Sequence, residues 1–117
     1  MDNHVHLLAT PPANGRIGQL MQRLGRNYVA LLNGRHGLIG TLWEGRYNAC
    51  IVDSADYVLR SYRYIELNPV RARLTNDSAA YRWSSCPANL GQRGHSALPP
   101  PPCWLALGSN PIERCNA

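Results

Sequence analysis

The sequence predicts an α+β domain, and the evidence is two alternating segments and two helical ones. Residues 1–10 and 46–52 alternate polar and apolar side chains in short runs, which is typical of strands. Residues 16–33 and 53–69 place apolar side chains three and four positions apart, which is typical of amphipathic helices. The predicted order along the chain is therefore strand, helix, strand, helix.

The first predicted strand carries His4 and His6, and Pro11 and Pro12 follow it. Residues two apart in a strand point to the same face, so the two imidazoles lie side by side. Buried rings would each need a hydrogen-bond partner, whereas two neighbouring imidazoles can bind one metal ion. Because two histidines at this spacing also occur by chance, a metal site needs a third ligand from elsewhere in the chain.

The first predicted helix covers residues 16–33, with Asn14 as its expected N-cap and Gly34 as its expected end. A polar stripe lies away from its apolar seam. This stripe fits a solvated helix face and a phosphate-binding face equally well. Its residues are Arg16, Gln19, Arg23 and Arg26.

The second predicted helix covers residues 53–69. Asp53 or Ser54 can cap its first amides, and Pro69 is expected to end it. At about 100° per residue, one face carries Tyr57, Tyr64 and Asn68. An adjoining face with Tyr62 is the natural one to bury. Aromatic side chains at helical spacing are more often core than catalyst, so this helix alone leaves both interpretations open.

Composition limits the class of protein without deciding its function. The 117 residues suffice for one domain, and the net charge of +5 comes from twelve arginines and no lysine. The planar guanidinium of arginine can donate two hydrogen bonds to one phosphate, so this composition is compatible with a nucleic-acid partner. A bias toward arginine codons explains the same composition. The four cysteines form no C-x-x-C pair, and no signal peptide or transmembrane run is present. These features predict reduced thiols and a soluble, cytoplasmic protein with no membrane partner.

The composition changes near residue 86. Residues 81–85 include Tyr81 and Trp83 and are expected to anchor back on the domain, whereas proline, glycine and serine dominate afterwards. The sequence therefore predicts a domain over residues 1–85 and an irregular tail over residues 86–117.

Four blocks of the chain resemble, in order, those of the REP-associated tyrosine transposases, a branch of the single-tyrosine HUH transposases. The resemblance runs from residue 1 to about residue 85, and the blocks are specific in combination rather than singly. They are MDNHVHLL at residues 1–8, GTLWEGRY at residues 40–47, YRYIELNPVR at residues 62–71 and YRWSS at residues 81–85.

The resemblance implies a fold, a reaction and a set of site residues. Members of this family have a ferredoxin-like sheet flanked by helices. They cut single-stranded DNA near hairpins with a tyrosine nucleophile and a divalent metal, leaving a 5′-phosphotyrosine link. By this resemblance Tyr64 is the nucleophile, and His4, His6 and Asn68 are ligands for Mg²⁺ or Mn²⁺. From their positions around Tyr64 and on the preceding predicted strand, Arg60, Arg63 and Arg46 are further candidate DNA contacts, although exposed arginines are often only solvated.

The chain departs from the family at its start, and this leaves alternatives open. Family members carry a strand, a helix and a second strand ahead of the histidine motif, so the resemblance predicts an N-terminally truncated domain. Three hypotheses remain: an active DNA-cleaving enzyme, a non-catalytic remnant that only binds nucleic acid, and a small zinc-binding module. The DNA hairpin recognised, the metal and the oligomeric state are left open.

Overall fold

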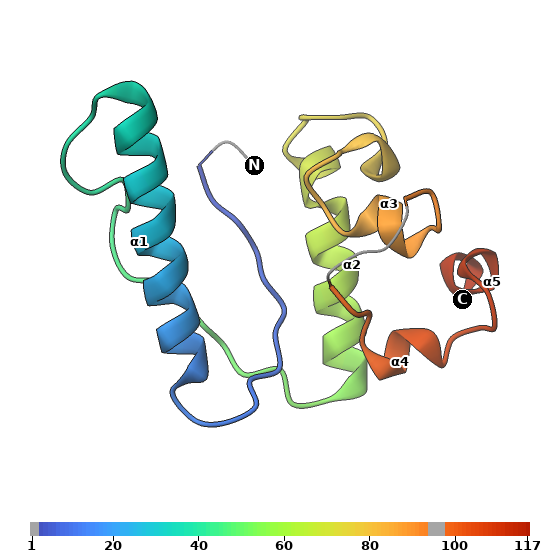
Figure 1. Ribbon diagram of the computed structural model, residues 1–117. Coiled ribbons are helices and arrows are strands. Elements are labelled where there is room, and N and C mark those ends of the chain that lie inside the picture. Colours follow the sequence, from blue (N-terminus) through green and yellow to red (C-terminus); the bar gives the residue numbers. More distant parts are fainter. Residues whose placement is uncertain (1–2, 94–97) are drawn as a thin grey trace. The chain divides into compact units, whose positions relative to one another are not determined.

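The structure is a computed structural model that describes residues 3–93 and 98–117 (Figure 1). The chain divides into two compact units, each described here by itself. The first unit comprises Met1–Leu8 with Val52–Ala117, and the second comprises Ala9–Ile51. All regular structure in the described residues is helical.

The predicted α+β fold with a ferredoxin-like sheet is wrong for this structure. Strands were expected at residues 1–10 and 46–52. Residues 1–2 lie outside the described residues, and the rest of both segments belongs to neither a helix nor a strand (Figure 1). A strand exists through hydrogen bonds to a neighbour, and no described segment offers either of them a paired strand. Alternation indicates which face of a strand would be buried, but it does not supply the partner.

The second unit is built on α1 (Arg16–His36). The helix starts after Gly15 and ends at Gly37, so the expected cap at Asn14 and the expected end at Gly34 are both wrong. Gly37 has a φ of 63°, a left-handed conformation that glycine adopts without strain, and its amide donates to the Asn33 carbonyl. Gly34 has no such geometry and lies inside the helix.

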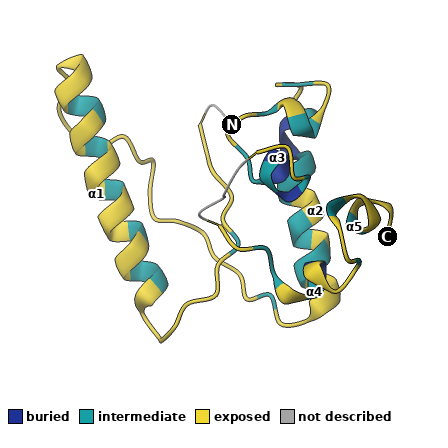
Figure 2. Cartoon of the chain, turned by 45° about the vertical axis from the view of Figure 1, so that its right-hand side comes forward, coloured by how far each residue is buried: buried dark blue, intermediate teal, exposed yellow. Residues whose placement is uncertain are grey.

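No residue of α1 is buried, and its surface is mostly exposed (Figure 2). Within this unit the ring of Trp43 packs 5.7 Å from the ring of Tyr28, between centroids. Trp43 also lies against Gly25, where an added Cβ would sit 3.2 Å from the indole nitrogen. A side chain at this position would therefore require the indole to shift by a few tenths of an ångström.

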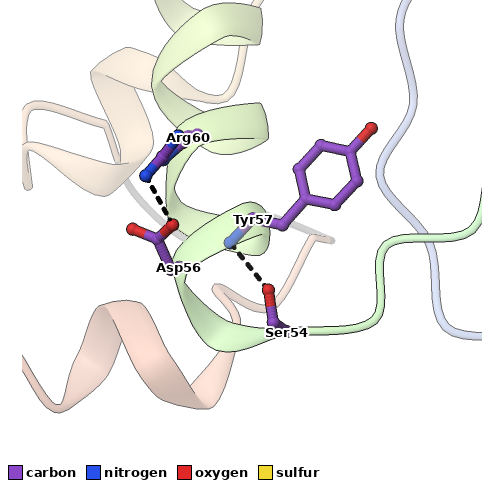
Figure 3. Close-up of polar contacts among 4 residues, drawn as sticks. All are labelled: Ser54, Asp56, Tyr57 and Arg60. Carbon is purple, nitrogen blue, oxygen red and sulfur yellow. Dashed lines mark hydrogen bonds and ion pairs between the residues drawn. The ribbon is translucent and has the colours of Figure 1, made fainter.

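In the first unit, α2 (Ala55–Arg71) begins as the sequence predicts. The Ser54 hydroxyl accepts a hydrogen bond of 3.3 Å from the Tyr57 amide (Figure 3). Asp56 lies in the first turn, where a negative charge suits the helix dipole, and its carboxylate pairs with Arg60 at 2.8 Å. Both charged side chains are exposed, so we expect this pair to contribute little stability.

The expected end of α2 at Pro69 is wrong, because the helix continues to Arg71. A proline inside a helix removes one amide donor, but the carbonyl groups around it can still accept. Here the Asn68 carbonyl accepts from Ala72 and the Pro69 carbonyl accepts from Leu74, each at 2.9 Å. The last turn is thus closed despite the proline, which is itself buried.

Residues 86–117 were expected to be irregular, but their described part, residues 86–93 and 98–117, contains three short helices. Each of them has a proline at its first or second position, where the missing amide costs nothing. The proposed boundary at residue 85 stays a prediction. The helices, with the 3-10 turn that precedes them, are η1 (Ser78–Ala80), α3 (Cys86–Asn89), α4 (Pro102–Leu105) and α5 (Pro111–Asn116).

The small core of this unit lies between α2 and these C-terminal helices. The Tyr62 ring packs 5.9 Å from the buried Trp104 of α4, between centroids. Asn89 of α3 donates a 2.6 Å hydrogen bond to the Glu66 carboxylate. Burial, with the nearby charge of Glu66, raises the pKa of Tyr62 to about 12. One face of α2 is therefore committed to packing.

Replacing the capping hydroxyl should weaken α2. Ser54→Ala leaves the Tyr57 amide without its acceptor, and we expect a loss of about 1 kcal/mol in the free energy of unfolding. Urea unfolding followed by circular dichroism measures this change. Ser54→Asp retains an acceptor and should stay close to the wild type; equal losses in the two variants would contradict the cap.

The buried phenol of Tyr62 should ionise late and make stability fall at alkaline pH. Its pKa is 10.0 when unperturbed and about 12 in the folded chain, so the unfolded state releases this proton first. Stability contributed by the phenol is thus complete below pH 10 and is lost as pH rises toward 12. The groups that face it are Glu66, Asn89 and Cys86.

An absorbance titration of phenolate formation, combined with unfolding at each pH, tests this assignment. Tyr62→Phe keeps the ring against Trp104 and should remove the late ionisation together with the alkaline loss of stability. The matched control is Tyr64→Phe, which changes a tyrosine on the other face of α2. If the late step survives Tyr62→Phe, the phenol has been assigned to the wrong residue.

Candidate functional site

Three of the predicted site residues lie together in the first unit. The rings of His4 and His6 pack edge to face with centroids 5.0 Å apart. The ring of His6 in turn packs 5.5 Å from the ring of Tyr64 on α2, again edge to face. We call His4, His6 and Tyr64 the ring cluster. It joins the N-terminal segment to the helix that carries the predicted nucleophile.

The two histidines differ in their surroundings. The His4 Nδ1 atom lies 2.7 Å from the Asn3 side-chain oxygen, an acceptor, so this contact suits the tautomer that has its proton on Nδ1 and a lone pair on Nε2. For His6, burial and then the charge of His4 lower the pKa of the imidazole. Both effects favour a neutral His6 ring with a nitrogen lone pair, the form that binds a metal ion.

Tyr64 and its rival Tyr62 have opposite environments on the same helix. Tyr64 is 46% exposed and contacts His6. Tyr62 packs on Trp104, and its raised pKa makes its phenolate harder to form. A nucleophile must reach its substrate and lose its proton, so the geometry favours Tyr64 over Tyr62.

Asn68 lies one turn beyond Tyr64 on the same face of α2 and is only 8% exposed. The ring contacts join His4, His6 and Tyr64, and the side-chain amide of Asn68 is not part of them. Two imidazole nitrogens and one amide oxygen form a donor set that suits several divalent ions. Among the residues described, no group of three histidine, cysteine, aspartate or glutamate side chains is placed to hold a metal. The role of Asn68 stays a prediction.

Arg71 belongs to the same face and was missed in the sequence. Its guanidinium carbon lies 5.3 Å from the centroid of the Tyr64 ring, in a cation–π arrangement. The signal was present, because residues seven apart in a helix share a face. It was overlooked because Pro69 was expected to end the helix before Arg71.

The arginines expected to contact DNA fall into two groups. On α2, Arg63 is exposed, whereas Arg60 already pairs with Asp56 (Figure 3). Arg46 and the α1 arginines belong to the second unit and are exposed. The α1 set borders a shallow hollow of about 630 Å³. Its basic residues are Arg16, Arg23 and Arg26.

No helix in the described part of the chain is long and apolar enough to cross a membrane.

Comparison with known protein families places these residues in context. A family model described as "Transposase IS200 like" matches residues 1–68, which include the ring cluster and Asn68. The comparison with curated proteins and that with solved structures each found no match. The match covers more than half of the 117 residues and confirms that the chain is a transposase, whereas the finer assignment to the REP-associated branch stays a prediction. The chain belongs to the IS200-like transposases, a family of DNA-processing proteins.

Proposed function

We propose that this chain cleaves and rejoins single-stranded DNA with Tyr64 as the nucleophile. The observation that carries the proposal is the contact between the exposed Tyr64 ring and His6, within a ring cluster covered by the family match. A phenol beside two imidazoles brings a nucleophile next to two side chains that can bind a metal ion.

The proposed reaction exchanges one phosphodiester for another. The phenol of Tyr64 loses its proton to solvent, its oxygen bonds to the scissile phosphorus, and the bond from phosphorus to the 3′ oxygen breaks. The departing 3′ oxygen takes up a proton and becomes a free hydroxyl, while the 5′ phosphate stays on the tyrosine. Attack by a 3′ hydroxyl on this link reverses the sequence and joins a strand. A phenolate is a good leaving group for that reverse step.

A divalent ion, Mg²⁺ or Mn²⁺, belongs to this proposal. His4, His6 and Asn68 would hold it, and the family match spans all three. When bound, such an ion supplies Lewis-acid polarisation of a phosphate oxygen. The hydrogen bond from His4 to Asn3 orients the imidazole so that Nε2 is the nitrogen left for the metal.

The proposed substrate is single-stranded DNA next to a hairpin of the REP type, as the four sequence blocks suggest. The exposed arginines of α1 and α2, with Arg46, would bind its phosphates. The zinc-binding module has less support, because no three histidine, cysteine, aspartate or glutamate side chains lie together in the described residues. The non-catalytic binder is the alternative that the first experiment separates from the enzyme.

A covalent-adduct assay tests the nucleophile. Labelled hairpin DNA with a single-stranded flank is incubated with the chain and Mn²⁺, then run on a denaturing gel. We expect a shifted band that EDTA prevents and that Tyr64→Phe abolishes. Tyr62→Phe, the matched control on the buried face, should keep most of the band. Salt-sensitive binding without any adduct would contradict the enzyme and favour the non-catalytic binder.

Direct metal titration tests the proposed ligands without relying on activity. The titration is followed by the paramagnetic signal of free Mn²⁺. The wild type should bind one ion, and His6→Ala should lose that binding. Asn3→Ala removes the group that orients His4, and we expect affinity to fall about 10- to 100-fold. His36→Ala, a histidine of α1 in the other unit, is the control. Equal Mn²⁺ affinity in the wild type and His6→Ala would refute the ligand set.

A further inference from the structure

We propose that Arg71 binds the non-bridging oxygens of the phosphate that Tyr64 attacks. This inference rests on the proposed function, since it names the residue that holds the substrate at the same site. It also adds to the arginines expected from the sequence, because Arg71 was not among them.

The continuation of α2 through Pro69 is what places Arg71 here. Seven residues are almost two full turns, so Arg71 and Tyr64 lie on one face of the helix. The hydrogen bonds from Ala72 and Leu74 to the carbonyls of Asn68 and Pro69 close the turn that carries it. The guanidinium carbon then lies 5.3 Å from the Tyr64 ring centroid.

The guanidinium is free to bind an anion in this position. A cation over an aromatic ring uses its charge, and the N–H donors at its rim stay available. No carboxylate lies within ion-pair distance of Arg71 among the described residues, where the ion pair found is that of Arg60 with Asp56. Arg71 is exposed and therefore accessible to a strand of DNA. Arginine binds two phosphate oxygens at once through parallel N–H donors.

The role of Arg71 in the reaction involves no proton transfer. Its guanidinium has hydrogen-bond donors and no acceptor, so it acts by binding and orienting the phosphate. By holding two phosphate oxygens beside the ring, it would set the distance between the phosphorus and the Tyr64 oxygen. It would also offset the negative charge that develops on those oxygens as the tyrosine attacks.

A scan with neutral phosphates tests this contact independently of cleavage. In a Tyr64→Phe background, which cannot form the proposed link, a hairpin oligonucleotide carries one methylphosphonate at each position in turn. Affinity is measured by fluorescence anisotropy. With Arg71 present, the methylphosphonate at one position should weaken DNA binding by about tenfold, because the neutral phosphate loses its charge-assisted contact with the guanidinium. In the variant that also carries Arg71→Gln, the methylphosphonate at that position should cause no loss of affinity relative to the unmodified oligonucleotide. We call this loss of affinity the penalty.

Two variants separate a phosphate contact from a general effect of charge. Arg71→Lys keeps the charge without the planar fork and should recover only part of the penalty. Arg73→Gln removes the same charge just beyond the helix and should leave the penalty at full size. Circular dichroism of each variant reports whether α2 remains helical.

The outcomes distinguish this inference from the proposed function. If the penalty persists unchanged in Arg71→Gln, Arg71 acts only as a positive charge at the helix end and the inference is overturned, even where the wild type forms an adduct. If the penalty depends on Arg71 but the wild type forms no adduct, the phosphate contact stands and the nucleophile proposal fails. A wild type that binds no hairpin overturns both.

Discussion

The packing of Tyr62 against Trp104 decides which face of α2 is available for chemistry. Tyr62 and Tyr64 are two residues apart and so point about 160° away from each other around the helix. Burying one therefore exposes the other. The hydrogen bond from Asn89 to Glu66, one turn after Tyr62, strengthens the same contact. The ring cluster, Asn68 and Arg71 all depend on this choice of face.

Much of α2 could be predicted from its sequence, because the signals there are local. A serine that caps a first turn, an acidic residue after it and a periodic apolar face need no information from distant residues, and all three agree with the structure. The end of the helix could not be predicted from Pro69 alone. Whether a proline terminates a helix depends on whether the later amides find acceptors, and here they do.

The two predicted strands failed for the opposite reason. A strand is stabilised by a partner that lies elsewhere in the chain, so alternation at residues 1–10 and 46–52 is necessary but not sufficient. The contact between His6 and Tyr64 is also long-range. Sequence spacing alone predicts that His4 and His6 share one face and that Tyr64 and Asn68 share another. That these two faces lie close together was predicted only from the family resemblance. The structure supplies this contact for Tyr64 through His6.

The residues that orient α2 extend beyond the stretch that the family match covers. The match ends at residue 68, whereas Arg71, Asn89 and Trp104 follow it. Packing and hydrogen bonding from α3 and α4 hold the buried face, and the extra turn after Pro69 adds a positive charge to the open face. A family pattern that stops at Asn68 includes the ring cluster and Asn68, but the environment of Tyr64 is also set by residues outside that pattern. Substitutions in the C-terminal helices should therefore change the exposure of Tyr64 without touching any residue of the ring cluster.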